Sequence, residues 1–195
     1  MYPSVLSFRP TFLFAFFIAM LAIATPIPAA SQQPGSATQT TKFLNFSAQA
    51  PIDWQSHTPS SRMRLLEFSS KSNTRETVNI VVYYFGQGQG GSAGANVARW
   101  RSQFSLPDQF SPPEPTIARF KVQGMAVTLA EFSGNYARGI GLGPGGPGLI
   151  DHSLIAGIIE SPRGNLIYQL WGPENIVRQH RDGFIKFIKT TRIEP

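Results

Sequence analysis

A glycine-rich segment in the middle of the chain contains a pattern found at nucleophilic serines. Residues 90–94 read GGSAG and match G-x-S-x-G, in which the serine stands on a sharp turn between a strand and a helix. Asp151, followed by His180 or His152, completes one of the chain orders that such a site uses. One hypothesis is therefore a small exported serine hydrolase with Ser92, Asp151 and His180 as catalytic residues.

The surroundings of Ser92 favour a structural role over catalysis. Six residues separate it from Phe85, where the preceding strand-like run ends, so the loop lacks the tight geometry that exposes a nucleophile. A serine directly before a helical segment is typical of an N-cap, whose hydroxyl accepts a backbone N–H. We therefore expect Ser92 to cap a helix over residues 93–104.

The same loop also matches a dinucleotide-binding pattern, because residues 86–91 read GQGQGG. A dinucleotide unit needs a parallel strand after its helix, whereas residues 106–115 contain four prolines. The three histidines, His57, His152 and His180, lie far apart in the sequence and form no recognisable metal-binding motif. We predict no cofactor and no metal site.

Composition and charge exclude further classes of protein. The chain has no cysteine, which rules out thiol nucleophiles and disulfides. Its 17 Lys and Arg against 11 Asp and Glu give a net charge of +6. The cations form no dense run, so nucleic acid is not an expected partner. A modest positive balance instead suits an acidic protein or an anionic membrane surface.

The N-terminal residues predict export. Arg9 precedes an uncharged apolar run over residues 11–24, and small residues and prolines follow up to Ala30, which is the layout of a signal peptide. We predict a signal peptide over 1–30, with an uncleaved membrane anchor as the alternative, and a periplasmic or secreted mature protein. Residues 31–41 are polar and predict a flexible linker, which leaves 42–192 for a single domain.

The remaining chain alternates between strand-like and helical patterns. The strand candidates are residues 43–48, 63–68, 77–85, 116–122, 125–136, 149–160 and 165–171. Tight turns at 123–124 and 162–164 predict two hairpins, and helical spacing is present over 93–104 and 173–191. We predict an α+β fold: a single antiparallel β-sheet of about six to seven strands with two α-helices packed on it, in the order β-β-β-α-β-β-β-β-α.

Two local features make the chain similar to a known family. Residues 46–54 begin with an aromatic and end in Pro51 and Trp54, and residues 166–188 hold a strand, a Gly-Pro-Glu turn and an amphipathic helix. Over 42–192 the chain resembles the PsbP/Mog-like family, that of the photosystem II extrinsic protein PsbP and the Ran-binding Mog proteins. Exported bacterial members share the passage Tyr84–Ser92. The resemblance implies the fold above, no bound cofactor, and a partner-binding or assembly role.

The last predicted helix carries the candidate binding surface, because cations gather opposite the apolar side that must face the sheet. They are Arg178, Arg181, Lys186, Lys189 and Arg192. The simplest interpretation is a solvated helix face, and the functional one is a surface that docks an acidic protein partner or an anionic membrane. Our leading hypothesis is an exported, non-enzymatic binding or assembly domain, and the serine hydrolase is the alternative.

Overall fold

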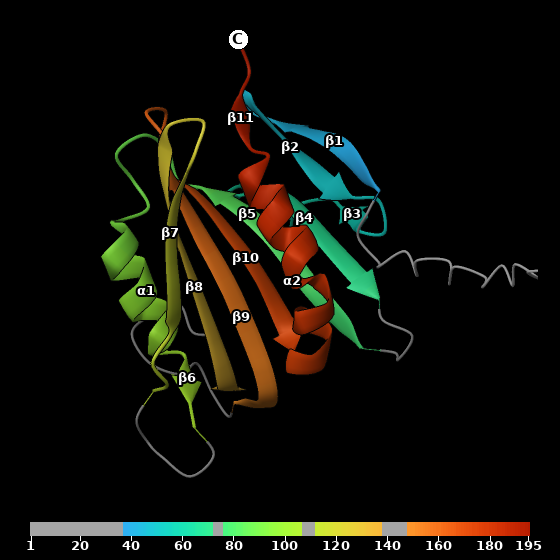
Figure 1. Ribbon diagram of the computed structural model, residues 1–195, viewed down its shortest axis with the longest axis vertical. Helices are drawn as coiled ribbons and strands as arrows, with labels where there is room; N and C mark the ends of the chain where they lie inside the picture. Colours follow the sequence, from blue (N-terminus) through green and yellow to red (C-terminus); the bar gives the residue numbers. More distant parts are fainter. Residues whose placement is uncertain (1–36, 72–75, 107–111, 138–147) are drawn as a thin grey trace, which may run out of the picture. The chain divides into compact units, whose positions relative to one another are not determined.

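The computed structural model describes residues 37–71, 76–106, 112–137 and 148–195, which form an α+β fold (Figure 1). The predicted signal peptide (1–30) and most of the glycine-rich segment 139–148, which separates two of the strand candidates, lie outside these residues. The elements are β1 (Thr38–Phe43), β2 (Phe46–Pro51), β3 (Gln55–His57), β4 (Arg64–Lys71), β5 (Thr77–Tyr84), α1 (Ala93–Arg101), β6 (Phe104–Ser105), β7 (Thr116–Val122), β8 (Met125–Tyr136), β9 (Leu149–Glu160), β10 (Leu166–Pro173), α2 (Glu174–Lys189) and β11 (Arg192–Ile193).

The described strands form two sheets, where the sequence predicted one of about six to seven strands. The larger sheet has the order β3-β4-β5-β10-β9-β8-β6, with β7 also paired to β8, and the smaller has the order β1-β2-β11. Every pairing is antiparallel. The class of fold is therefore the predicted one, and the sheet count and strand order are corrected.

The smaller sheet contains a turn that the sequence pattern did not predict. The run over 43–48 was predicted as one strand, but Phe43 pairs with Phe46 across Leu44 and Asn45, so the chain reverses there. The returning strand β2 pairs with β1, which begins at Thr38. The last residues of the predicted 31–41 linker are therefore strand, because the backbone of a polar segment still pairs when a partner strand lies beside it.

Both predicted hairpins of the larger sheet are confirmed. Val122 pairs with Met125 around Gln123 and Gly124, whose φ angles of 50° and 79° are those of the turn that best matches strand twist. Strands β9 and β10 likewise pair antiparallel across residues 161–165. Strand β5 lies inside the sheet between β4 and β10, which suits a strand with apolar side chains on both faces.

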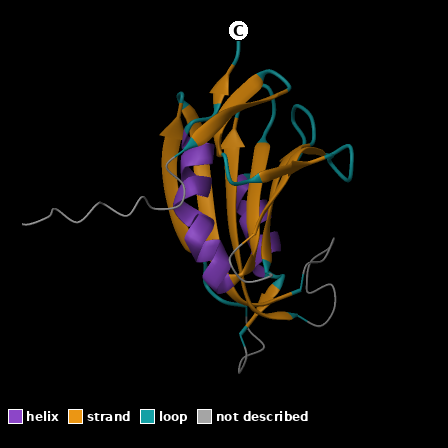
Figure 2. Ribbon diagram, turned by 90° about the vertical axis from the view of Figure 1, so that its right-hand side faces the viewer, coloured by secondary structure: helices purple, strands orange, loops and turns teal. Residues whose placement is uncertain are grey.

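The two helices cover opposite faces of the larger sheet (Figure 2). Alternating residues of a strand point to opposite faces, and on β9 Ile155 belongs to one core while Leu154 belongs to the other. The first core contains Phe184 and other apolar residues of α2, and the second contains Trp100 of α1. Two separate apolar cores, one on each face, hold the domain together.

Candidate functional site

Helix α2 positions most of the predicted binding residues. Its buried side is formed by Ile176, Val177, Phe184, Phe187 and Ile188, which pack on the sheet and leave the other side in water. The Asn175 Oδ1 atom accepts the Ile176 N–H at 3.0 Å at the start of the helix. The Thr190 hydroxyl donates to the Lys186 carbonyl at 2.9 Å at its end. The helix thus ends at Lys189, earlier than predicted.

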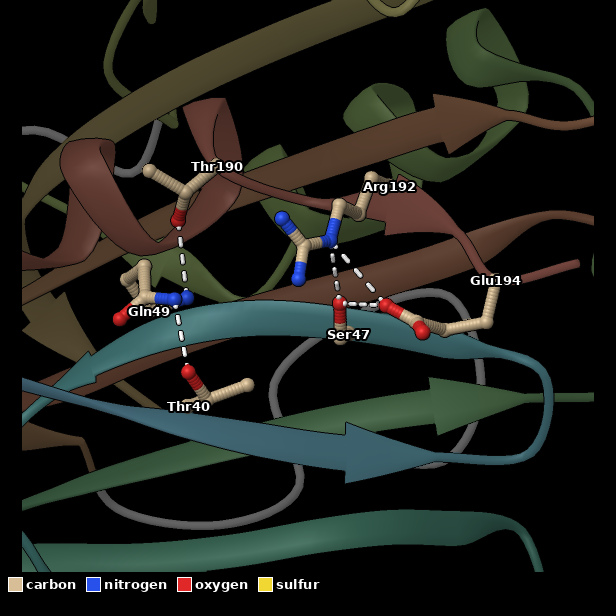
Figure 3. Close-up of polar contacts among 6 residues, drawn as sticks. All are labelled: Thr40, Ser47, Gln49, Thr190, Arg192 and Glu194. Atoms are coloured by element: carbon tan, nitrogen blue, oxygen red, sulfur yellow. Dashed lines mark hydrogen bonds and ion pairs between the residues drawn. The ribbon is translucent and has the colours of Figure 1, made fainter.

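Arg192 lies on β11 and not on the helix, which corrects its predicted place in the helical row of cations. Its Nε–H donates to the Ser47 hydroxyl at 2.9 Å and to a Glu194 carboxylate oxygen at 3.1 Å (Figure 3). The Ser47 hydroxyl also donates to that carboxylate. The hydrogen bond from Ser47 and the pairing with Arg192 lower the pKa of Glu194 below its usual range. Arg192 therefore joins β11 to β2.

A second polar contact fastens the end of α2 to the smaller sheet. The Gln49 backbone N–H donates to the Thr190 hydroxyl at 2.9 Å, and the Gln49 side-chain amide donates to the Thr40 hydroxyl at 2.9 Å (Figure 3). The next residue, Thr191, has its hydroxyl 2.8 Å from that of Tyr168, and both are buried. These contacts hold the chain after α2 in place, so the C-terminal part of the helix has a defined position against β2.

Arg181 forms an ion pair across 50 residues of sequence. Its Nε–H and Nη2 donate to the two carboxylate oxygens of Glu131, on β8, at 2.9 and 2.7 Å. The hydrogen bond and the charge of Glu131 raise the pKa of Arg181. With Ser133 and Ser153, whose hydroxyls are 2.7 Å apart, the pair lines a cavity of about 140 Å³. Arg181 thus ties α2 to the sheet.

Three exposed cations remain on α2: Arg178, Lys186 and Lys189, here called the α2 basic surface. The Arg178 side chain is 72% exposed and lies 3.1 Å from a Glu174 oxygen, an arrangement that contributes little to stability. Within the described part of the chain, neither lysine forms an ion pair. The Lys189 ammonium lies 5.5 Å from the centre of the Phe120 ring. The α2 basic surface is therefore smaller than the predicted set of five.

Ser92 is the N-cap of α1, as predicted. Its hydroxyl accepts the Ala95 N–H at 3.2 Å, and its backbone is extended. It lines an open cavity of about 430 Å³ whose other walls are residues of the β5–α1 loop and the β9–β10 turn. Neither Asp151 nor His180 lines this cavity.

The structure does not bring together Ser92, Asp151 and His180, the three residues of the alternative hydrolase hypothesis. Asp151 lies at the start of β9, in a cavity with Glu174 and Arg178, whereas Ser92 lies beside the turn that follows β9. At about 3.3 Å per residue, ten strand residues correspond to roughly 30 Å. His180 belongs to α2, on the face of the sheet opposite α1. The G-x-S-x-G match thus reflects a glycine-rich loop before a capped helix.

His180 is half-buried on the side of α2, near Asp53. Burial lowers the pKa of His180, and the negative charge of Asp53 opposes part of that shift. In residues 37–71, 76–106, 112–137 and 148–195, no three His, Asp or Glu side chains gather as metal ligands would. Among the same residues, neither helix is long and apolar enough to span a membrane.

Comparison with the solved structure of a cyanobacterial protein supports the predicted fold. The solution structure of cyanobacterial PsbP (CyanoP) from Synechocystis sp. PCC 6803 aligns over 87% of this chain and 99% of that one, with a TM-score of 0.51 and 12% identity. LpqN of Mycobacterium tuberculosis, described as involved in cell envelope biogenesis, aligns over 83% and 87%, with a TM-score of 0.47 and 15% identity. No protein-family model and no curated protein matches the sequence. The domain has a PsbP-like fold, which at this identity is a statement about architecture alone.

Proposed function

We propose that this protein is an exported, non-enzymatic binding domain that docks an acidic protein partner through the α2 basic surface. The observation that carries the proposal is the exposure of Lys186 and Lys189, which have no ion pair within the described residues. Export rests on the signal-peptide pattern of residues 1–30. The PsbP-like fold supports a binding role by analogy, and the separation of Ser92 from Asp151 and His180 removes the motivation for the hydrolase.

The charges of the α2 basic surface contribute more to binding an acidic partner than to the stability of the fold. Exposed cations on one side of a helix repel each other modestly and contribute little to stability. A carboxylate-rich counter-surface would turn that repulsion into attraction and would direct the encounter. Because the cations are exposed, the attraction should weaken as the Debye length falls from about 30 Å at 0.01 M salt to about 3 Å at 1 M.

The test is a crosslinking capture from the native envelope with the mature protein as bait. The triple variant Arg178→Glu, Lys186→Glu, Lys189→Glu should keep its melting temperature within a few degrees and lose the partner at low salt. All three side chains are exposed, and their removal leaves no buried group unpaired.

The control changes charge elsewhere, in the exposed residues Arg119 and Lys121 of β7. The Arg119→Glu, Lys121→Glu variant should capture the partner as the parent does, whereas the matched pair Lys186→Glu, Lys189→Glu should lose it. Equal losses in both pairs would show that net charge alone drives capture. Unchanged capture by the α2 variant, with the parent's salt dependence, would show that the surface is merely solvated.

A further inference from the structure

Four of the connections at one end of the larger sheet, the end where β5 and β9 finish and β4 and β10 begin (Figure 1), contact one another: the β1–β2 turn, the β3–β4 connection, the β5–α1 loop and the β9–β10 turn. The Arg163 guanidinium of the β9–β10 turn lies against the side-chain amide of Asn45 in the β1–β2 turn. The Tyr84 hydroxyl donates to the Arg163 carbonyl at 2.7 Å, and the Tyr84 N–H donates to the Met63 carbonyl at 3.0 Å. The four connections therefore form one continuous surface.

Three large apolar side chains of this surface are exposed to water. Leu44 is 62% exposed, Met63 is 52% exposed and Phe85 is 36% exposed. Leu44 stands at the tip of the β1–β2 turn with φ of 50°, a backbone conformation that favours glycine or asparagine over leucine. Leu44 is exposed, and its backbone conformation is unfavourable for leucine. The stability of the turn therefore does not account for a leucine at this position.

Exposed cations stand close to these apolar residues along the chain or across the turns. Lys42 precedes Leu44 by two residues, and Arg62 precedes Met63. The Arg163 backbone carbonyl accepts the hydroxyl of Tyr84, the residue before Phe85. Arginine and lysine have long stems that reach lipid phosphates while apolar neighbours enter the interface. The cations of this surface would thus contact the charged headgroups of an anionic bilayer, and its apolar side chains would contact the acyl chains beneath them.

We propose that this end of the domain, through Leu44, Met63 and Phe85 with Lys42, Arg62 and Arg163, binds the surface of an anionic lipid bilayer. The contact is peripheral, because three turn side chains reach only the boundary between headgroups and acyl chains. None of the six residues belongs to the α2 basic surface, so the protein would hold a membrane and a protein partner through separate sites. An acidic protein bound at this end would interact with the three cations but would not require the three exposed apolar side chains.

The test is co-sedimentation of the mature protein with phosphatidylcholine vesicles, with and without phosphatidylglycerol. We expect binding only to the vesicles that contain phosphatidylglycerol. Leu44→Asn with Met63→Gln should weaken that binding about tenfold or more, since each side chain loses its transfer into the apolar layer. Asparagine tolerates the Leu44 backbone, so this variant should fold, and a circular dichroism melt will verify that it does.

Control variants test whether vesicle binding is specific to this surface or is caused by any exposed apolar side chain or by net charge. Leu149→Asn with Ile150→Gln removes apolar side chains that are 50% and 69% exposed at the start of β9, the opposite end of the sheet, and should bind vesicles as the parent does. Lys42→Gln, Arg62→Gln, Arg163→Gln should lose about fivefold per cation. The same change in Arg178, Lys186 and Lys189 should have a smaller effect.

Three results would overturn the lipid assignment. Equal binding to both vesicle types would remove the anionic requirement, and unchanged binding by Leu44→Asn with Met63→Gln would remove the apolar one. Loss of an acidic protein partner in the Lys42, Arg62, Arg163 variant, with no vesicle binding by the parent, would assign the surface to a protein. The vesicle results do not bear on partner capture by α2, which the Arg178, Lys186, Lys189 variant tests separately, so failure of one proposal can be distinguished from failure of the other.

Discussion

Helix α1 should depend on one side chain, Trp100, for its attachment to the sheet. The helix has nine residues, too few to be stable alone in water, and only Asn96 and Trp100 of it are buried. Trp100 is 1% exposed and shares the second core with Phe104 and Phe132. Burying a tryptophan removes about 200 Å² of surface from water, which at about 25 cal/mol per Å² gives an upper figure of about 5 kcal/mol.

Trp100→Ala should therefore lower the free energy of unfolding by about 4 kcal/mol, within the range of about 3–5 kcal/mol found for such truncations. Because whole domains are stable by only about 5–15 kcal/mol, the variant should fold but be marginal. Urea unfolding followed by far-ultraviolet circular dichroism measures the loss without relying on tryptophan fluorescence. Val97→Ala, a half-buried position on the same helix, is the control and should cost about 1 kcal/mol or less.

A loss below about 1 kcal/mol in Trp100→Ala would refute this reasoning, since it would place the ring in water. A loss of about 4 kcal/mol in both variants would instead indicate that the whole helix, and not the indole, is the sensitive feature. Trp100→Phe should fall between Trp100→Ala and the parent, because it keeps part of the buried aromatic surface.

Three other predictions test the contacts described above. A double-mutant cycle with Glu131→Gln and Arg181→Met should give a coupling energy of about 1 kcal/mol in urea unfolding, modest because Arg181 is 42% exposed; zero coupling would free Arg181 for a partner. Burial lowers the pKa of His180, so the folded state binds fewer protons and stability should fall as the pH drops below about 6.5. His180→Gln should reduce that slope, and an unchanged slope would assign it to other groups. Ser92→Ala should cost about 1 kcal/mol as a lost N-cap, and stoichiometric labelling of Ser92 by a fluorophosphonate would contradict a purely structural serine.

Local features of the sequence were sufficient to predict much of the fold. Gln123 and Gly124 predict their hairpin because they form a two-residue connection between two strand-like runs, with glycine at the second position, where φ is positive. The apolar spacing of Val177, Phe184 and Ile188 predicts the buried side of α2, since one helical period places all three on one face. The N-cap role of Ser92 is equally local, because the capping bond spans only three residues.

The tertiary structure decided which charged and polar residues meet. Periodicity shows that Arg181 is at the side of its helix, but only the packing of α2 on β8 places it against Glu131. Arg192 continues the helical row of cations in sequence, yet the chain leaves the helix before it and the residue pairs with Ser47 on β2. The interactions of a charged side chain depend on the charges of the groups that lie next to it. In this fold those groups belong to strands that are distant in the sequence.

The sequence by itself determined the α+β class, the two hairpins of the larger sheet and the amphipathic character of α2, because each depends on residues a few positions apart. The tertiary structure alone decided the second sheet, the ion pairs that reduce the predicted set of five cations to Arg178, Lys186 and Lys189, and the separation of Ser92 from Asp151 and His180. Those outcomes depend on which strands pair and which face each helix covers. Such choices are made by the burial of whole apolar faces, and no short pattern encodes them.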